Sequence, residues 1–242
     1  MPLNPRLVDV WTFDLLATDE QVEYACDLLS GDERQRAERF HFPADRRRFV
    51  IARAGLRQVL GEQLETNPKL LAFEYSEYGK PELSSPNTNL RFNTSRSRER
   101  ALIACTRGCK IGVDIECLRI DLEVDDLAQR FFSVAENERL RVVAPDLRHL
   151  AFLRCWTCKE AYAKALGKGL SLDPRGLDVS VVLNKSLASP AGAMENFVVN
   201  EWSLVVLGDT TGQGYASALA VESDGFVVKM HPIIDDKQQA AR

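Results

Sequence analysis

The sequence lacks the long apolar segment that a membrane-spanning helix requires. None of its apolar runs approaches the ~18 consecutive residues that cross a bilayer, although 45% of its 242 residues are hydrophobic. Residues 1–6 do not resemble a secretory signal either. We therefore expect a cytoplasmic protein that does not insert into a membrane.

Cysteine is too scarce and too irregularly spaced for a disulfide framework. Six cysteines occur in 242 residues, whereas disulfide-stabilised domains are small and rich in cysteine. Cys155 and Cys158 have the spacing of a redox motif, but they fall inside an expected helix and not at the strand-to-helix entry of such a motif. Cys105 and Cys109 have no histidine close by in the sequence. We therefore predict buried or half-buried thiols, with a zinc site as the alternative.

An excess of positive charge is also absent. The chain has 31 Lys and Arg residues against 35 Asp and Glu residues, for a formal net charge of −4. It has no basic stretch interleaved with aromatic residues, the pattern that binds single-stranded nucleic acid. The composition therefore argues against nucleic-acid binding. The length suits one large domain or two small ones.

The most strongly patterned segment is W-T-C-K-E-A-Y-A-K at residues 156–164. Apolar residues recur around it at helical spacing, and Gly167 stands where a helix should end. We therefore predict one long helix over residues 147–167. Glu160 and Lys164 are four residues apart and share one face of this helix. A surface ion pair would explain these two residues, and a functional site is the alternative.

A second patterned segment, I-G-V-D-I-E ending at Glu116, favours the functional site. Its β-branched residues predict a strand, in which Asp114 and Glu116 point to the same face. With Glu160 they make three carboxylates, the oxygen donors that hold Mg²⁺ while leaving positions for phosphate and water. Positive charge for a phosphate would come from Lys159 and Lys164.

These segments together resemble a known family. G-V-D-I-E at residues 112–116 and W-x-x-K-E-A-x-x-K at residues 156–164 resemble the paired signature of the 4′-phosphopantetheinyl transferases. Upstream, G-K-P at residues 79–81 and F-N-T-S-R-S at residues 92–97 resemble further blocks of that family in the same order. The length of the chain resembles that of the long, two-lobed Sfp-like type.

The resemblance implies a transferase that moves 4′-phosphopantetheine from coenzyme A to a serine of an apo acyl or peptidyl carrier protein, releasing 3′,5′-ADP. It implies Mg²⁺ held by Asp114, Glu116 and Glu160, with Glu160 and Lys164 as the catalytic residues. Arg96 stands where the family's block has His and keeps a positive charge there. The residues expected at coenzyme A are Lys80, Asn93, Ser95, Arg96, Lys159, Lys164 and, as the weakest candidate, Arg46.

The order of the predicted elements repeats along the chain. Ser30 with Glu33 and Ser133 with Glu136 are two helix-capping pairs, and each precedes a proline that begins a long helix. We therefore predict an α+β fold of two similar lobes related by pseudo-twofold symmetry, with the active site in the cleft between them. Such a chain would act as a monomer. The predicted divisions are residues 1–110 on the coenzyme A side, residues 111–234 with the metal site, and a frayed tail at residues 235–242.

Shorter elements follow from alternation and turn signals. Residues 102–106 and 111–116 are predicted to pair as a hairpin across Arg107 and Gly108. Residues 77–87 are predicted to form a loop. The other predicted strands are residues 7–13, 70–75, 90–93, 177–183, 197–207, 215–221 and 226–230.

Two other functions stay open at this point. A non-catalytic relative that binds coenzyme A or carrier proteins is suggested by Arg96, although three converging acids argue against a disused site. A Mg²⁺-dependent nuclease or phosphatase would use the same acids. The net negative charge argues against a nuclease.

Overall fold

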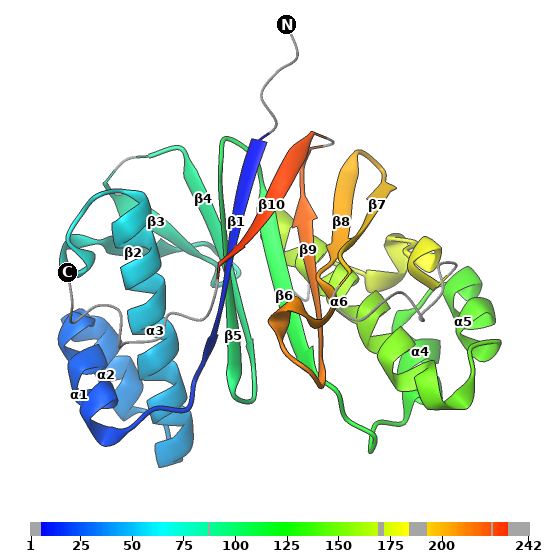
Figure 1. The fold of residues 1–242 in the computed structure, drawn as a ribbon, viewed down its shortest axis with the longest axis horizontal. Coiled ribbons are helices and arrows are strands. Elements are labelled where there is room, and N and C mark those ends of the chain that lie inside the picture. Colours follow the sequence, from blue (N-terminus) through cyan, green and yellow to red (C-terminus); the bar gives the residue numbers. More distant parts are fainter. Residues whose placement is uncertain (1–5, 87, 169–171, 184–192, 224, 232–242) are drawn as a thin grey trace, which may run out of the picture.

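The structure is a computed structural model that describes residues 6–86, 88–168, 172–183, 193–223 and 225–231. In this part of the chain, two four-stranded sheets and a two-stranded ribbon combine with helices in the predicted α+β fold (Figure 1). No helix in these ranges has the length and apolar character of a membrane span. The predicted tail at residues 235–242 lies outside the described residues.

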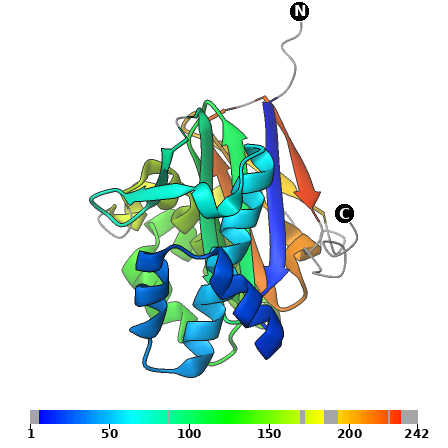
Figure 2. The ribbon, with the colours of Figure 1, turned by 90° about the vertical axis from the view of Figure 1, so that its left-hand side faces the viewer.

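The first sheet has the strand order β10-β1-β5-β4, with β1, β4 and β5 from the first half of the chain and β10 from its far end. Helix α3 packs on one face of this sheet, where Trp11, Phe13, Leu60 and Phe92 form a core. Helices α1 and α2 pack on α3 (Figure 2). The elements are β1 (Arg6–Asp14), α1 (Asp19–Leu28), α2 (Gly31–Glu38), α3 (Pro43–Gln63), β2 (Ala72–Tyr75), β3 (Pro81–Ser85), β4 (Leu90–Ser97) and β5 (Arg100–Arg107).

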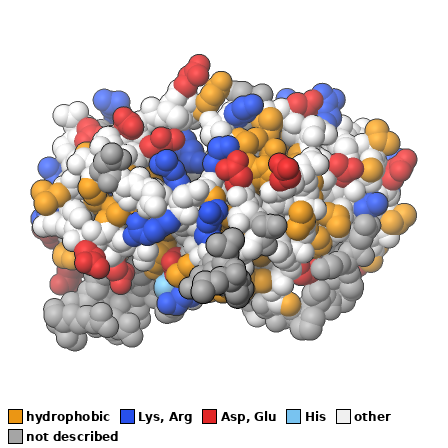
Figure 3. Space-filling view, turned by 90° about the horizontal axis from the view of Figure 1, so that it is seen from above, with side chains coloured by type: hydrophobic (Ala, Val, Ile, Leu, Met, Phe, Trp, Pro, Cys, Tyr) orange, Lys and Arg blue, Asp and Glu red, His pale blue; other side chains and the backbone are white. Residues whose placement is uncertain are grey.

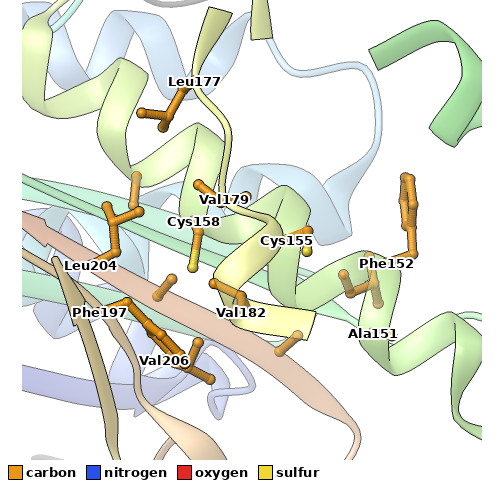
Figure 4. Packing of buried hydrophobic residues seen from close by; sticks show 14 of the residues in the cluster. Ala151, Phe152, Cys155, Cys158, Leu177, Val179, Val182, Phe197, Leu204 and Val206 are labelled. Atoms are coloured by element: carbon orange, nitrogen blue, oxygen red, sulfur yellow. The ribbon is translucent and has the colours of Figure 1, made fainter. Parts of the chain in front are cut away.

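The second half builds a sheet with the order β6-β9-β8-β7, against which helix α6 packs. Cys155 and Cys158 lie on α6 among the apolar residues of this core (Figure 4). The elements are β6 (Ile111–Cys117), α4 (Val124–Phe131), α5 (Val134–Arg141), α6 (Arg148–Leu166), β7 (Glu195–Val199), β8 (Trp202–Val206), β9 (Tyr215–Val221) and β10 (Phe226–His231).

The cysteines are free thiols that are buried or half-buried, as predicted. Burial raises the pKa of Cys158 to about 12. The pKa of Cys155 is also raised, by burial first and by the neighbouring Cys158. Because zinc binding and disulfide exchange both use the thiolate, the burial of these two groups disfavours both reactions.

Helix α6 lies unusually close to strand β6 because small residues face each other. A Cβ atom built on Gly112 would stand 1.9 Å from the backbone oxygen of Ala161 and 2.5 Å from the backbone nitrogen of Ala165. Only a residue without a side chain fits between the strand and the helix backbone. The glycine of the G-V-D-I-E segment therefore sets the distance between β6 and α6.

The two sheets share a core, but the predicted hairpin between them is wrong. Val10, Leu102, Val113 and Leu219 meet between the sheets. Strand β5 pairs with β1 and β4, whereas β6 pairs with β9. The turn around Gly108 therefore carries the chain from one sheet to the other, which leaves β4 and β6 as neighbouring edge strands.

Four smaller expectations also differ from the structure. Residues 177–183, predicted as a strand, contain the 3₁₀ turn Ser180–Leu183. The predicted loop at residues 77–87 contains β3. The predicted strand at residues 197–207 is replaced by the hairpin β7–β8, which turns at Asn200 and Glu201 with φ of 48° and 66°. Strand β10, assigned by prediction to residues 111–234, pairs in parallel with β1 in the first sheet.

A buried ionic network holds α2 against α3. The Ser30 backbone N–H donates to Glu33 Oε2 (3.0 Å), as the predicted capping pair requires. Arg57 Nε donates to the same carboxylate at 2.7 Å, and its Nη1 donates to the carbonyl oxygens of Pro68 and Leu71. Burial acts to raise the pKa of Glu33, but the bonds and charges of Arg57 and Arg53 lower it overall. The buried carboxylate therefore stays ionised and fully paired.

Candidate active site

Within the described ranges, strands β4 and β6 are joined by three polar side chains of β4 and not by hydrogen bonds between their backbones. Asn93, Ser95 and Ser97 are two residues apart, so they point from the same face of the strand. Each accepts a hydrogen bond from a backbone N–H group of β6. The donors are Val113 (2.9 Å), Ile115 (3.4 Å) and Cys117 (3.0 Å). We call this row of contacts the seam.

Asp114 and Glu116 point toward the seam, as the alternation of β6 predicts. Ser95 Oγ donates to Asp114 Oδ1 at 2.8 Å, and Ser97 Oγ donates to Glu116 Oε2 at 2.9 Å. Asp114 is only 3% exposed, whereas Glu116 is half-buried. Each acid on one sheet is therefore held by a hydroxyl group from the other sheet.

Helix α6 brings Glu160 and Lys164 to the same place. Lys164 Nζ lies 2.5 Å from Asp114 Oδ1 and 2.8 Å from Ser95 Oγ, so its ion pair crosses from helix to strand. Burial and then the charge of Asp114 raise the pKa of Glu160. Burial and Asp114 also raise the pKa of Glu116, although the Ser97 hydrogen bond opposes them. We call Asp114, Glu116 and Glu160 the acid cluster.

The acid cluster has the donor chemistry of a divalent-cation site. Asp114 Oδ2 is buried and has no hydrogen-bond partner among the described residues. An unpartnered oxygen beside two further carboxylates suits a hard cation such as Mg²⁺. In the described part of the chain, no three acidic, His or Cys side chains stand in a finished metal-binding arrangement. The carboxylates would have to turn toward one another to share an ion.

Lys159 does not lie at this site. It is 3% exposed, and its Nζ contacts Glu136 Oε1 (2.8 Å) and the carbonyl oxygens of Pro174 (2.7 Å) and Leu177 (2.5 Å). Glu136 is the capping residue of α5, so this network repeats the one around Glu33 in the first half. The predicted phosphate contact of Lys159 is thus replaced by a structural role, because the lysine's donors already contact Glu136, Pro174 and Leu177.

The structure places three other predicted coenzyme A residues apart from the acid cluster. Lys80 Nζ donates to the carbonyl oxygens of Lys164 (2.8 Å) and Ile111 (3.4 Å), which ties the end of α6 to the start of β6. Asn93 is buried in the seam. Arg46 is exposed in the first turn of α3.

A pocket of about 330 Å³ lies beside the acid cluster, and its lining includes Ser95 and Lys164, which both contact Asp114. Its polar walls carry Arg36, Arg53 and Arg96, of which only Arg53 forms an ion pair among the described residues. Both Arg36 and Arg96 lie over the Phe49 ring, and burial and then the charge of Arg36 lower the pKa of Arg96, although Asp45 opposes them. We call this the basic pocket. Its aromatic walls are Phe13, Phe49 and Tyr75.

Arg36 and Ser97 join the site, although no role was predicted for either residue. Ser97 follows Asn93 and Ser95 at the strand period, and this alternation was the available signal for a shared face. Arg36 lies on α2 and lines the basic pocket from a distant part of the sequence. Nothing in the local pattern around Arg36 points to the pocket.

Comparison with known proteins identifies the family of this chain. A model of the 4′-phosphopantetheinyl transferase superfamily matches residues 110–220, and a model of the N-terminal part of a 4′-phosphopantetheinyl transferase matches residues 16–107. The chain is 40% identical over 179 residues to 4′-phosphopantetheinyl transferase HetI of Nostoc sp., covering 71% of this chain and 76% of that protein. It is 32% identical over 157 residues to Sfp of Bacillus subtilis, covering 64% and 67%. The chain therefore belongs to the 4′-phosphopantetheinyl transferase superfamily, as an enzyme of the Sfp-like type.

Proposed function

We propose that this enzyme transfers 4′-phosphopantetheine from coenzyme A to a serine hydroxyl of an apo acyl or peptidyl carrier protein, with release of 3′,5′-ADP. The observation that carries the proposal is that the acid cluster and Lys164 lie next to the basic pocket. A transferase acting on coenzyme A must hold a highly charged pyrophosphate and neutralise the charge that develops on the leaving phosphate.

The acid cluster would bind Mg²⁺ through Asp114, Glu116 and Glu160, and the ion when bound would neutralise pyrophosphate oxygens. Lys164 is already held beside the cluster by Asp114 and Ser95, so its ammonium group can contact a phosphate without a large movement. Glu160 is half-buried, whereas Asp114 is almost fully buried. We therefore assign acceptance of the serine proton to Glu160, directly or through a water molecule.

The basic pocket would hold the nucleotide end of coenzyme A. Arg96 and Arg36 have no carboxylate ion-pair partner among the described residues, so their charge is available to a phosphate monoester with two negative charges. The guanidinium carbons of Arg96 and Arg36 lie 5.9 Å and 5.4 Å from the centre of the Phe49 ring. Arginine in place of the family's histidine thus preserves a phosphate contact in this proposal.

We also propose the two-lobed division behind this site, with the boundary near residue 110 and the cleft along the seam. The support is the repeated network, in which a buried capping glutamate binds a basic residue of the following long helix in each half. Strand β10 is the exception, because it crosses into the first sheet. With all proposed groups on one chain, the enzyme would act as a monomer.

A mass measurement of an apo carrier protein tests the function directly. The carrier is incubated with the enzyme, coenzyme A and Mg²⁺, with EDTA in a parallel sample. A gain of one phosphopantetheine arm only without EDTA supports the transferase and its metal requirement. No gain on fatty-acid, polyketide and peptide carriers would favour a binding relative without catalysis.

The face in Figure 3, on which acidic and basic side chains are interspersed, does not favour a nuclease.

Replacing Arg96 by alanine should weaken the binding of coenzyme A more than the binding of 3′-dephospho-coenzyme A. We expect KM for coenzyme A to rise about 10- to 100-fold, the loss of a charge-assisted contact, with kcat nearly unchanged. KM for 3′-dephospho-coenzyme A should change little, because that substrate lacks the phosphate monoester. Arg96→His should keep most of the affinity. An equal rise in KM for both substrates would show that Arg96 does not bind the 3′-phosphate of coenzyme A.

A further inference from the structure

Ser97 is the last residue of β4, and its hydroxyl group both donates and accepts a hydrogen bond. Its Oγ donates to Glu116 Oε2 at 2.9 Å and accepts from the Cys117 backbone N–H at 3.0 Å. A serine hydroxyl has a single proton, and here that proton is directed at the carboxylate. The amide on the other side fixes the position of the oxygen.

The neighbouring serine makes the same pair of contacts two residues earlier. Ser95 Oγ donates to Asp114 Oδ1 at 2.8 Å and accepts from the Ile115 backbone N–H at 3.4 Å. Each serine therefore bonds one carboxylate of the acid cluster and the amide that follows that carboxylate on β6. Among the described residues, the third side chain of the seam, Asn93, hydrogen-bonds only a backbone amide of β6, so in this part of the chain the double contact is confined to the two positions opposite the acids.

We propose that Ser97 is a positioning residue that holds the Glu116 carboxylate toward the metal site from the opposite sheet. This inference rests on the proposed function, since it assumes that the acid cluster binds Mg²⁺. Glu116 is half-buried and at the end of β6, so its flexible side chain has other orientations open to it. The Ser97 hydrogen bond restricts it to one, as outer hydrogen bonds do for carboxylates in metal sites.

The test compares Ser97→Ala, which removes the hydroxyl group, with Ser97→Thr, which keeps it. Mn²⁺ binding to each protein without coenzyme A is followed by electron paramagnetic resonance. We expect the Ala variant to bind Mn²⁺ about 10- to 100-fold more weakly and the Thr variant to bind close to wild type. Backbone hydrogen exchange at Cys117 should become faster in the Ala variant only, because its amide loses the acceptor.

Ser203→Ala is the matched control. The Ser203 side chain also lies in a strand and donates a hydrogen bond, to the backbone oxygen of Ser223 at 2.8 Å, but it is fully buried and lies on β8, within the second sheet. This variant should lose some thermal stability and keep its Mn²⁺ affinity. If Ser97→Ala behaves like this control, with unchanged Mn²⁺ affinity, Ser97 only joins the strands and the positioning role is refuted.

The outcomes separate this inference from the proposed function. Wild-type protein that binds no Mn²⁺ and modifies no carrier would overturn the proposed function, and the positioning role with it. Wild-type protein that does both, while Ser97→Ala keeps normal Mn²⁺ affinity, would overturn the positioning role alone. Unchanged exchange at Cys117 in the Ala variant would contradict the geometry from which the inference starts.

Discussion

Replacing Asp114 by alanine should reduce phosphopantetheine transfer by at least ~1,000-fold, about 4 kcal/mol of transition-state stabilisation. Asp114 is the centre of the acid cluster: its Oδ1 contacts Ser95 and Lys164, and its Oδ2 is buried without a partner among the described residues. The variant loses a proposed metal ligand and the group that holds Lys164. Carrier-protein mass spectrometry over a time course measures the loss.

The Asp114 variant should nevertheless fold. Removing this carboxylate relieves its repulsion with Glu116 and Glu160, and Lys164 is half-buried and can turn toward water. Circular dichroism and the melting temperature should therefore stay close to wild type. Asp121→Ala is the matched control, because Asp121 is a surface acid paired with Arg119. Near-normal turnover of the Asp114 variant would mean that the acid cluster is not the metal site.

Replacing Gly112 by alanine should damage the fold itself. The added Cβ would stand 1.9 Å from the Ala161 backbone oxygen, and backbone on both sides cannot move aside as a flexible side chain can. We expect the free energy of unfolding to fall by about 3 kcal/mol or more. For a chain of this size that lowers the melting temperature by roughly 6–12 °C.

The same substitution should also disturb the chemistry, because pushing α6 away from β6 separates Glu160 from Asp114. Differential scanning calorimetry and a transfer assay at low temperature distinguish the two effects. Gly31→Ala is the control, since a Cβ at Gly31 meets nothing within 4 Å. A melting temperature equal to wild type in the Gly112 variant would show that β6 and α6 are not packed at this distance.

Most of the helices, and the shared face of Asp114 and Glu116 on β6, could be predicted from the sequence because their signals are local. The capping pairs at Ser30 and Ser133 are present as expected, and Gly167 ends α6 in the left-handed conformation with φ of 70°. Period two along β6 was enough to put Asp114 and Glu116 on one face. The two motifs that resemble the family then supplied Glu160 and Lys164.

The misplaced elements depend on long-range contacts. Two strands joined at Arg107 and Gly108 look like a hairpin, but which sheet each strand joins is decided by partners far along the chain. Lys159 has the local pattern of a surface charge beside Glu160. Its burial follows from Glu136 and from a 3₁₀ turn at Pro174–Gly176. The first half contains a matching 3₁₀ turn, Pro68–Leu70 after Asn67, whose Pro68 carbonyl oxygen accepts a hydrogen bond from Arg57. This parallel between the two halves was the signal in the sequence that could have predicted the burial of Lys159.

The parallel pairing of β10 with β1 has a consequence for biosynthesis. In this pair Val8 lies opposite Val228, so one edge of β1 is covered only after nearly all of the described chain has left the ribosome. Until then β1 presents an open, apolar strand edge, the kind of surface that invites pairing with another nascent chain. The first sheet therefore cannot be completed before β10 has been synthesised, and a gene split near residue 110 would yield an N-terminal fragment without its closing strand.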